Sequence, residues 1–172
     1  MNTFTVRALA PSDAQALLAF ETLNRAWFES QIDPRPPTFY SMEGVAEHIQ
    51  ACLADFAVGV WHPLVIEAPG GRIVGRANLK GINSPEGSAE VGYRIDQQFC
   101  GQGLATLALK RLIHEAHARW GLTHLMAYVY PRNIASSTVL QRCGFIAEAS
   151  EGEPPPGGTT CFLYSLPRRS AP

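Results

Sequence analysis

The sequence predicts one α/β (α+β) domain built on a mixed, mainly antiparallel sheet of about seven strands, with about four helices. Three observations support this prediction. The chain has 172 residues, which fits a single domain with a sizeable core. Stretches that alternate apolar and polar residues are interleaved with stretches of helical period. There is no repeat and no long linker, so one domain is expected to span residues 1–172.

The N-terminal half is expected to form a strand, two helices and a strand pair. Ser12 or Asp13 can cap the first helix, and the prolines within residues 32–37 end it, because proline cannot continue a helix. Ser41 opens the second helix. The predicted elements are a strand (4–9), a helix (11–29), a second helix (41–57) and two strands joined by a Pro-Gly-Gly turn (62–68 and 72–82).

The C-terminal half is expected to hold two further helices and four strands. One helix follows a glycine-containing loop, and the other ends near Gly144. The first of these helices has an apolar face at a 3.6-residue period, formed by Leu104, Leu107, Ala108, Leu112 and Ala116. The strands are expected at 89–96, 122–130, 145–149 and 160–167, the short helix at 133–143, and a flexible loop at 151–158.

Composition excludes several functional classes. The net charge of −1 and the pI near 6.5 leave no basic footprint for nucleic acid. No apolar run approaches the roughly 20 residues of a membrane span, and the first 15 residues lack the apolar core of a signal peptide, so a cytoplasmic protein is expected. The four cysteines form no CxxC pair, and His114 and His117 are three apart where the HExxH zinc motif needs four, so no metal is expected.

The glycines at residues 101 and 103 stand directly before a helix. Glycine is about 1 kcal/mol worse than alanine inside a helix, so its use here indicates that something approaches the backbone closely. A helix N-terminus exposes unpaired N–H groups and binds phosphate readily. The loop is therefore a candidate pyrophosphate cradle. From the glycines alone, the alternative is a tight turn that binds nothing.

The two common nucleotide fingerprints do not fit this loop. The string GxxxxGK[ST] of the P-loop does not occur in the chain. In the dinucleotide fingerprint GxGxxG, the position of the third glycine is held by Thr106.

A second motif follows the next strand. It reads N-x-x-S-x-x-V-x-x-x-x-G-F, with Asn133, Ser136, Val139, Gly144 and Phe145. Together with E-x-G-Y-x-I, which begins at Glu90, this pattern resembles the GNAT superfamily of acyl-CoA-dependent N-acetyltransferases. The resemblance covers about residues 3–166 and is most specific over residues 90–145. Within the superfamily the chain looks most like the Rim-type branch of ribosomal-protein N-terminal acetyltransferases and their relatives.

The resemblance implies a GNAT-like sheet whose strands 89–96 and 122–130 splay apart at the coenzyme A site. In that fold the pantetheine arm pairs with main-chain groups near Ile95, and Asn133 hydrogen-bonds it. The family's phosphate loop begins with Gln or Arg, which is replaced here by Cys100, so one polar contact to phosphate is lost. The implied pyrophosphate-binding residues are Cys100, Gly101, Gln102, Gly103, Leu104, Ala105 and Thr106.

The resemblance also implies the catalytic groups. Ser136 would donate to the leaving thiolate, since many members use a tyrosine where this chain has Leu140; the alternative is that Ser136 only caps its helix. Glu90 is a candidate base, and the alternative is a solvated carboxylate at a strand end. Tyr128 and Tyr130 either face the same groove or are packing residues.

These observations favour an enzyme that transfers an acetyl group from acetyl-CoA to a primary amine by direct attack in a ternary complex. The expected acceptor is a protein or peptide N-terminus or a small-molecule amine, with its pocket shaped by residues 27–56. Thr160 stands where Rim-type relatives often have aspartate, which leaves the last strand's part in the acceptor site open. No nucleic-acid or membrane partner is expected, and the protein is a monomer or homodimer. The alternatives are a longer acyl chain, or a coenzyme A-binding sensor or structural module without catalysis.

Overall fold

The fold is centred on a seven-stranded mixed sheet in the order β1-β2-β3-β4-β5-β7-β6. The computed structural model describes residues 3–149, 155–168 and 170. Every neighbouring pair of strands is antiparallel except β4 and β5. The strands are β1 (Thr5–Ala8), β2 (Trp61–Glu67), β3 (Ile73–Asn83), β4 (Ser88–Ile95), β5 (His124–Val129), β6 (Ile146–Ala147) and β7 (Thr160–Ser165). The predicted fold class is confirmed.

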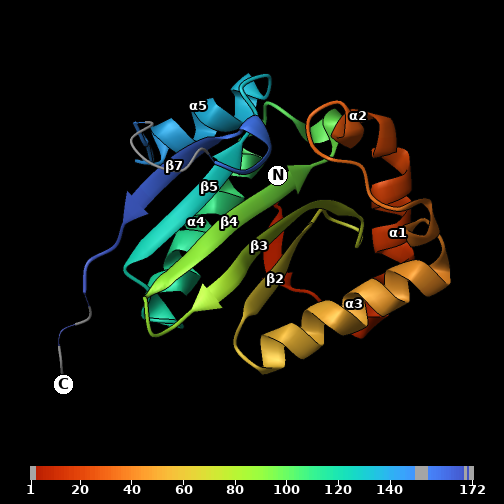
Figure 1. Ribbon diagram of the computed structural model, residues 1–172. Helices are drawn as coiled ribbons and strands as arrows, with labels where there is room; N and C mark the ends of the chain where they lie inside the picture. The colour runs from red at the N-terminus through yellow and green to blue at the C-terminus, as the bar shows by residue number, and fades with distance from the viewer. Residues whose placement is uncertain (1–2, 150–154, 169, 171–172) are drawn as a thin grey trace.

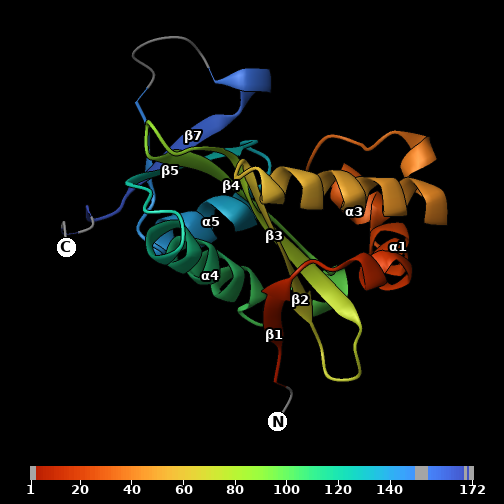
Figure 2. The same ribbon diagram turned by 90° about the horizontal axis from the view of Figure 1, so that it is seen from below.

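Helices cover both faces of the sheet (Figures 1 and 2): α1 and α3 lie on one side, and α4 and α5 lie on the other. Their bounds are α1 (Ala14–Leu23), α2 (Arg25–Glu29), α3 (Met42–Ala57), α4 (Leu104–Ala118) and α5 (Ile134–Arg142), and single 3-10 turns occur at residues 11–13, 37–39, 97–99 and 156–158. Among the described residues no helix has both the length and the apolar character needed to cross a membrane.

The prediction of a single helix over residues 11–29 is wrong in one respect: the segment divides at Asn24 into α1 and α2. The buried Asn24 side chain donates to the Phe20 carbonyl at 2.9 Å and accepts from the N–H of Gln97 at 2.9 Å. Gln97 lies just after β4, so the break ties the start of α2 to the end of that strand. A contact between residues this far apart in the chain has no local sequence signal.

The predicted helix caps have different outcomes. The Ser41 hydroxyl accepts from the Gly44 N–H at 3.0 Å, which confirms it as the cap of α3. Asp13 does not cap α1 with its side chain. Asp13 instead ends the 3-10 turn that precedes the helix. Its carboxylate accepts from the N–H of Ala10 at 2.8 Å and pairs with Arg7.

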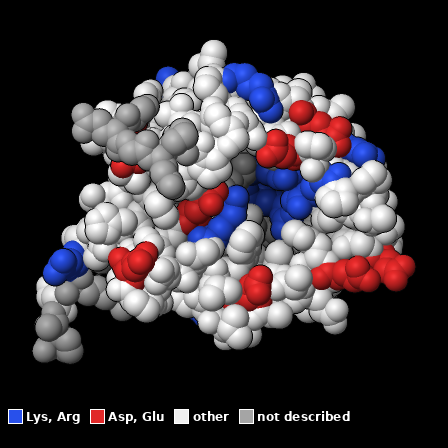
Figure 3. Space-filling model, viewed as in Figure 1, with Lys and Arg blue, Asp and Glu red and all other residues white. Residues whose placement is uncertain are grey.

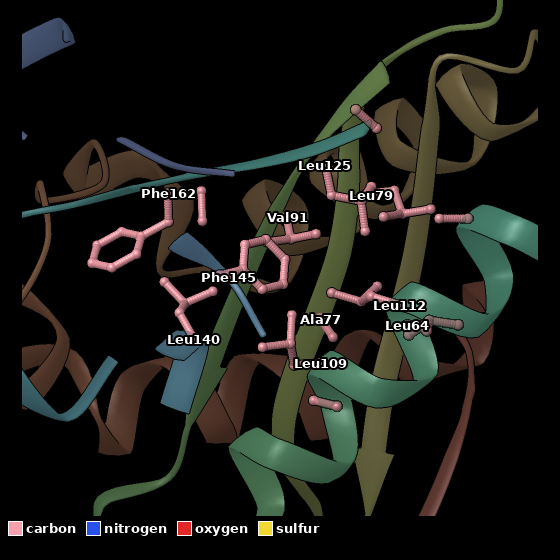
Figure 4. Close-up of a cluster of buried hydrophobic side chains, with 14 of the residues drawn as sticks. Leu64, Ala77, Leu79, Val91, Leu109, Leu112, Leu125, Leu140, Phe145 and Phe162 are labelled. Atoms are coloured by element: carbon pink, nitrogen blue, oxygen red, sulfur yellow. The ribbon is translucent and has the colours of Figure 1, made fainter. Parts of the chain in front are cut away.

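The larger core lies between the sheet and α4 with α5 (Figure 4). The α4 face is buried as predicted except at Leu107, which is 40% exposed, while Leu109 is fully buried. At 100° per residue, Leu107 points about 140° away from Leu112 at the centre of that face. A second cluster, including Leu17, Val45 and Ile49, packs α1 and α3 on the opposite face.

The strands β4 and β5 pair only at their first residues. The parallel ladder runs through Ser88 with His124, Ala89 with Leu125, and Glu90 with Met126. β4 continues to Ile95 and β5 to Val129 without further registered pairs between them. This confirms the predicted splay, and it leaves main-chain groups of both strands facing a gap.

Candidate active site

The first of two hollows at this gap has a volume of about 300 Å³. It is lined by the end of β4, the loop before α4, the first turn of α4, the start of α5 and residues of α2 and the segment after it. Eight of the nine predicted coenzyme-binding residues line it; Gln102 is exposed and does not. The eight are Ile95, Cys100, Gly101, Gly103, Leu104, Ala105, Thr106 and Asn133.

Glycine is required in the loop before α4 for two reasons. Gly101 and Gly103 have φ angles of +79° and +80°, a left-handed conformation that side chains disfavour. No neighbouring heavy atom lies within 4 Å of a Cβ built at either residue, so the space above the loop is open. The loop therefore combines a constrained backbone with room for a ligand to approach it.

The start of α4 presents free hydrogen-bond donors to the first hollow. The first main-chain bond of the helix joins the Leu107 N–H to the Gly103 carbonyl at 3.0 Å. The N–H groups of Leu104, Ala105 and Thr106 thus have no intrahelical acceptor, and they carry the positive end of the helix dipole. This is the arrangement that binds a phosphate group, and the residues fit a pyrophosphate.

The Cys100 thiol is not activated as a nucleophile. Its sulfur lies 3.5 Å from the carbonyl of Asp96, and burial followed by the charge of Asp96 raises the pKa of the thiol above its ordinary value. The lowering of a thiol pKa that a helix N-terminus favours is therefore absent here. A nucleophilic role has no support in this geometry.

At the start of α5, Asn133 is the helix cap. Its side-chain oxygen accepts from the Ser136 N–H at 3.2 Å, so the alternative that Ser136 only caps the helix is wrong. The Ser136 hydroxyl instead lies 2.8 Å from the hydroxyl of Tyr93 on β4. Burial raises the pKa of Tyr93 to about 12, so the phenol is an even weaker acid than an exposed tyrosine. Tyr93 belongs to the E-x-G-Y-x-I motif, but sequence reasoning did not assign it a role.

The second hollow, of about 590 Å³, lies on the face shown in Figure 3. Glu90 lines it, and its carboxylate is 3.4 Å from the Lys80 ammonium, with the Glu90 side chain about one-third exposed. Tyr128 and Tyr130 line the same hollow, and the Tyr130 hydroxyl donates to the Asp33 carboxylate at 2.8 Å. Both tyrosines therefore face the groove.

Besides Cys100, the two other positions at which the chain departs from the family pattern have ordinary structural roles. Leu140, where many members have a tyrosine, is fully buried in the core between α5 and the sheet. Thr160 pairs with Val129 in the ladder of β5 with β7. Its neighbour Thr159 lines the second hollow, so the residue just before β7 borders that hollow with a hydroxyl and not with a carboxylate.

The two hollows meet at the gap between β4 and β5. The residues that line both are Ile32, Tyr93, Arg94, Asn133 and Ser136. The segment 27–56, which was expected to shape the acceptor pocket, lines both hollows, with Trp27 in the first and His48 in the second. Within the described part of the chain, no group of three or more His, Cys, Asp or Glu side chains could hold a metal ion.

A splayed sheet with a phosphate cradle at the next helix defines the class of acyl-CoA-dependent acyltransferases. The chain belongs to the acetyltransferase (GNAT) domain family, which matches residues 3–146. It is an acetyl-CoA-dependent N-acetyltransferase, with acetyl-CoA as the co-substrate.

Known proteins similar to this chain include acetyltransferases named for ribosomal substrates. The "Probable N-acetyltransferase YjcK" of Bacillus subtilis (strain 168) is 29% identical over 152 residues, covering 86% of this chain and 82% of that protein. Ribosomal-protein-S5-alanine acetyltransferase from Vibrio fischeri has a TM-score of 0.85 at 22% identity, over 96% of each chain. RimL, a ribosomal L7/L12 alpha-N-protein acetyltransferase in complex with coenzyme A, has a TM-score of 0.82 at 24% identity, over 95% and 94% of the two chains.

Proposed function

We propose that the protein transfers an acetyl group to a primary amine in a ternary complex, with the two substrates entering from opposite sides of the sheet gap. The observation that carries this proposal is that the two hollows share Tyr93, Asn133 and Ser136. A thioester in the first hollow and an amine in the second would meet at these residues. Direct transfer then needs positioning and proton movement, without an acyl-enzyme.

On the coenzyme side, the chain supplies main-chain donors and one amide. The N–H groups over residues 100–106 would hold the pyrophosphate, and main-chain groups of β4 near Ile95 would pair with the pantetheine arm. The side-chain oxygen of Asn133 is already engaged as a cap, so its NH₂ group is the part free to donate to that arm. An acetyl thioester supplies an electrophilic carbonyl carbon and a thiolate leaving group.

The reaction forms one C–N bond and breaks one C–S bond. The neutral amine attacks the thioester carbonyl, the amine's proton passes to Glu90 directly or through water, and the thiolate departs with a proton donated by Ser136. The Tyr93 hydroxyl, 2.8 Å from that of Ser136, holds the serine in place and can return the proton to it. Glu90 then releases its proton to water, and water restores the proton of Tyr93. The products are the N-acetyl amine and the free thiol of coenzyme A.

The acceptor is a protein or peptide N-terminus or a small-molecule amine. The names of the similar Vibrio fischeri enzyme and of RimL point to ribosomal-protein N-termini for those two proteins. The second hollow, at about 590 Å³, is also of a size that encloses a small ligand.

The test is release of free thiol from acetyl-CoA across a panel of peptide N-termini, polyamines, amino acids and aminoglycosides, with the product's mass measured. We expect turnover with at least one amine. When both substrates are varied, double-reciprocal plots of the initial rate should give intersecting lines. Parallel lines with an acetylated protein would indicate an acyl-enzyme and refute direct attack. Coenzyme A binding without thiol release on any amine would instead favour a sensor or structural module.

A further inference from the structure

Three arginines gather around one buried carboxylate on the wall of the second hollow. Glu21 of α1 is fully buried and accepts from the Nη atoms of Arg35 at 3.2 Å, Arg76 at 3.1 Å and Arg94 at 3.1 Å. The arginines come from the segment before α3, from β3 and from β4, and all three line the second hollow. Figure 3 shows basic side chains gathered in the hollow at the middle of this face.

The cluster has more positive charge than Glu21 neutralises. Three guanidinium groups face a single carboxylate, which leaves two positive charges beside the hollow. His48 is 2.9 Å from Arg76, but burial and then the charges of Arg76 and Arg35 lower its pKa to about 3, so it is neutral at pH 7. Burial lowers the pKa of Arg94 only to about 10, so Arg94 stays charged.

The other acids of the hollow are engaged elsewhere. Glu90 pairs with Lys80, and the exposed Asp33 accepts the hydroxyl of Tyr130 at the rim. Within the described residues these two carboxylates and Glu21 are the acids in or directly against the hollow, and Glu21 alone touches the arginine cluster.

Most N–H donors of the cluster have no hydrogen-bond partner among the described residues. A guanidinium has five N–H donors, yet the hydrogen bonds of Arg35 and Arg94 that lie within the described residues are one each, both to Glu21. The Nε atoms of Arg35 and Arg76 are buried without a partner among those residues. One arginine would neutralise the charge of Glu21. The two further charges and the unpartnered buried donors are costly, and an anion bound in the hollow would offset that cost.

The cluster also has a defined place relative to the site of transfer. Arg94 is one residue beyond Tyr93 on β4, and it lines both hollows, as Ser136 does. Arg35 and Arg76 line only the second hollow. An acceptor whose amine lies at Ser136 would therefore extend its remaining groups towards the guanidinium donors of Arg94 and Arg35.

We propose that the acceptor carries an oxyanion, a carboxylate or a phosphate group, which Arg35, Arg94 and Arg76 bind in the second hollow. The inference rests on the proposed function and names the substrate class for the same site. Guanidinium groups match the planar or tetrahedral oxygens of these anions through paired N–H donors. The anion could belong to a small amine such as an amino acid, or to an acidic side chain behind a peptide N-terminus, and the experiment separates the two sources.

The test compares matched acceptors with acetyl-CoA held saturating. Amino acids are paired with their amides, aminoalkyl phosphates with the neutral aminoalcohols, and peptides with Asp at the second position with the same peptides carrying Asn. We expect kcat/KM to be at least tenfold higher for the anionic member in one series, and that series identifies the source. The quantity compared between variants is the ratio of kcat/KM for the anionic acceptor to kcat/KM for its neutral partner. Because both values come from one preparation, a smaller folded fraction does not change this ratio.

The variant Arg35→Gln should reduce this ratio to near one, and Arg35→Lys should restore part of it. Arg25→Gln is the matched control: Arg25 pairs with Glu29 on α2 and lines neither hollow, so its ratio should equal that of the native protein. Equal use of anionic and neutral acceptors by the native protein would overturn the oxyanion site while leaving acetyl transfer intact. A ratio that survives in Arg35→Gln would also overturn it.

A direct binding measurement covers the case in which none of these amines is a substrate. With coenzyme A saturating, so that the first hollow is covered, inorganic phosphate should raise the thermal midpoint of the native protein and of Arg25→Gln, and should raise that of Arg35→Gln much less. Equal shifts in all three proteins would place the phosphate elsewhere and refute the proposal. Absence of turnover together with the Arg35-dependent shift would count against the proposed function and for the anion site.

Discussion

The substitution Gly103→Val tests the phosphate cradle at the start of α4. Gly103 has a φ of +80°, and a side chain there would occupy the open space through which a phosphate reaches the N–H groups of residues 104–106. Valine in a left-handed conformation costs about 1–2 kcal/mol of stability or more, because its Cβ is branched. Blocking the approach should in addition weaken coenzyme A binding at least tenfold, or about 1.4 kcal/mol.

The strain and the blocked approach are separated by Gly70→Val. Gly70 has a φ of +95° and open space around its Cβ position, but it lies in the turn between β2 and β3 and lines neither hollow. Both variants should lose similar stability in thermal unfolding, and only Gly103→Val should lose affinity in calorimetry with coenzyme A. Undiminished affinity in folded Gly103→Val protein would show that the pyrophosphate does not bind here.

Three further substitutions test the groups around the sheet gap. Ser136→Ala should slow turnover by only about tenfold to a hundredfold, because a thiolate is a tolerable leaving group even without a proton donor. The control Ser137→Ala changes the neighbouring serine, which lines neither hollow, and should leave turnover unchanged; equal turnover in the two variants would show that Ser136 is not the acid. Asn133→Ala should raise the KM for acetyl-CoA, and it should lower the free energy of unfolding by about 1 kcal/mol because α5 loses its cap. A loss of stability with unchanged KM would show that Asn133 caps the helix and does not bind the coenzyme. Glu90→Gln should lower kcat by about 10²–10⁴-fold with unchanged coenzyme A affinity by calorimetry; a native-like kcat at every pH would show that Glu90 is not the base.

Much of the fold was predictable because its signals are local. The Ser41 cap, the apolar period of α4 and the glycines before it act within a few residues, and each is found as predicted apart from Leu107. The coenzyme side of the site shares this property, since seven of its nine predicted residues form one continuous stretch, residues 100–106. A continuous stretch stays together in the fold, and of these nine residues only Gln102 lies outside the first hollow.

The acceptor side was not predictable in this way. Tyr93 contacts Ser136 across 43 positions, and Glu21 contacts Arg94 across 73 positions. Neither pair has a spacing that a helix or a strand would bring together, and no pattern in residues 27–56 indicates that Arg35 lines a hollow. The break at Asn24 has the same cause, because its partner Gln97 belongs to a distant loop.

The sequence by itself determined the family, the coenzyme and the helix start that presents donors to phosphate, because backbone conformation and capping depend on neighbouring residues. The tertiary structure decided which side chains line the hollow proposed for the amine. The packing of α1 against the sheet brings Glu21 to Arg76 of β3 and Arg94 of β4. The packing of α5 on the other face sets Ser136 against the Tyr93 hydroxyl. Burial in that packing then raises the pKa of Tyr93 and lowers the pKa of His48, because the interior disfavours the charged form of each side chain.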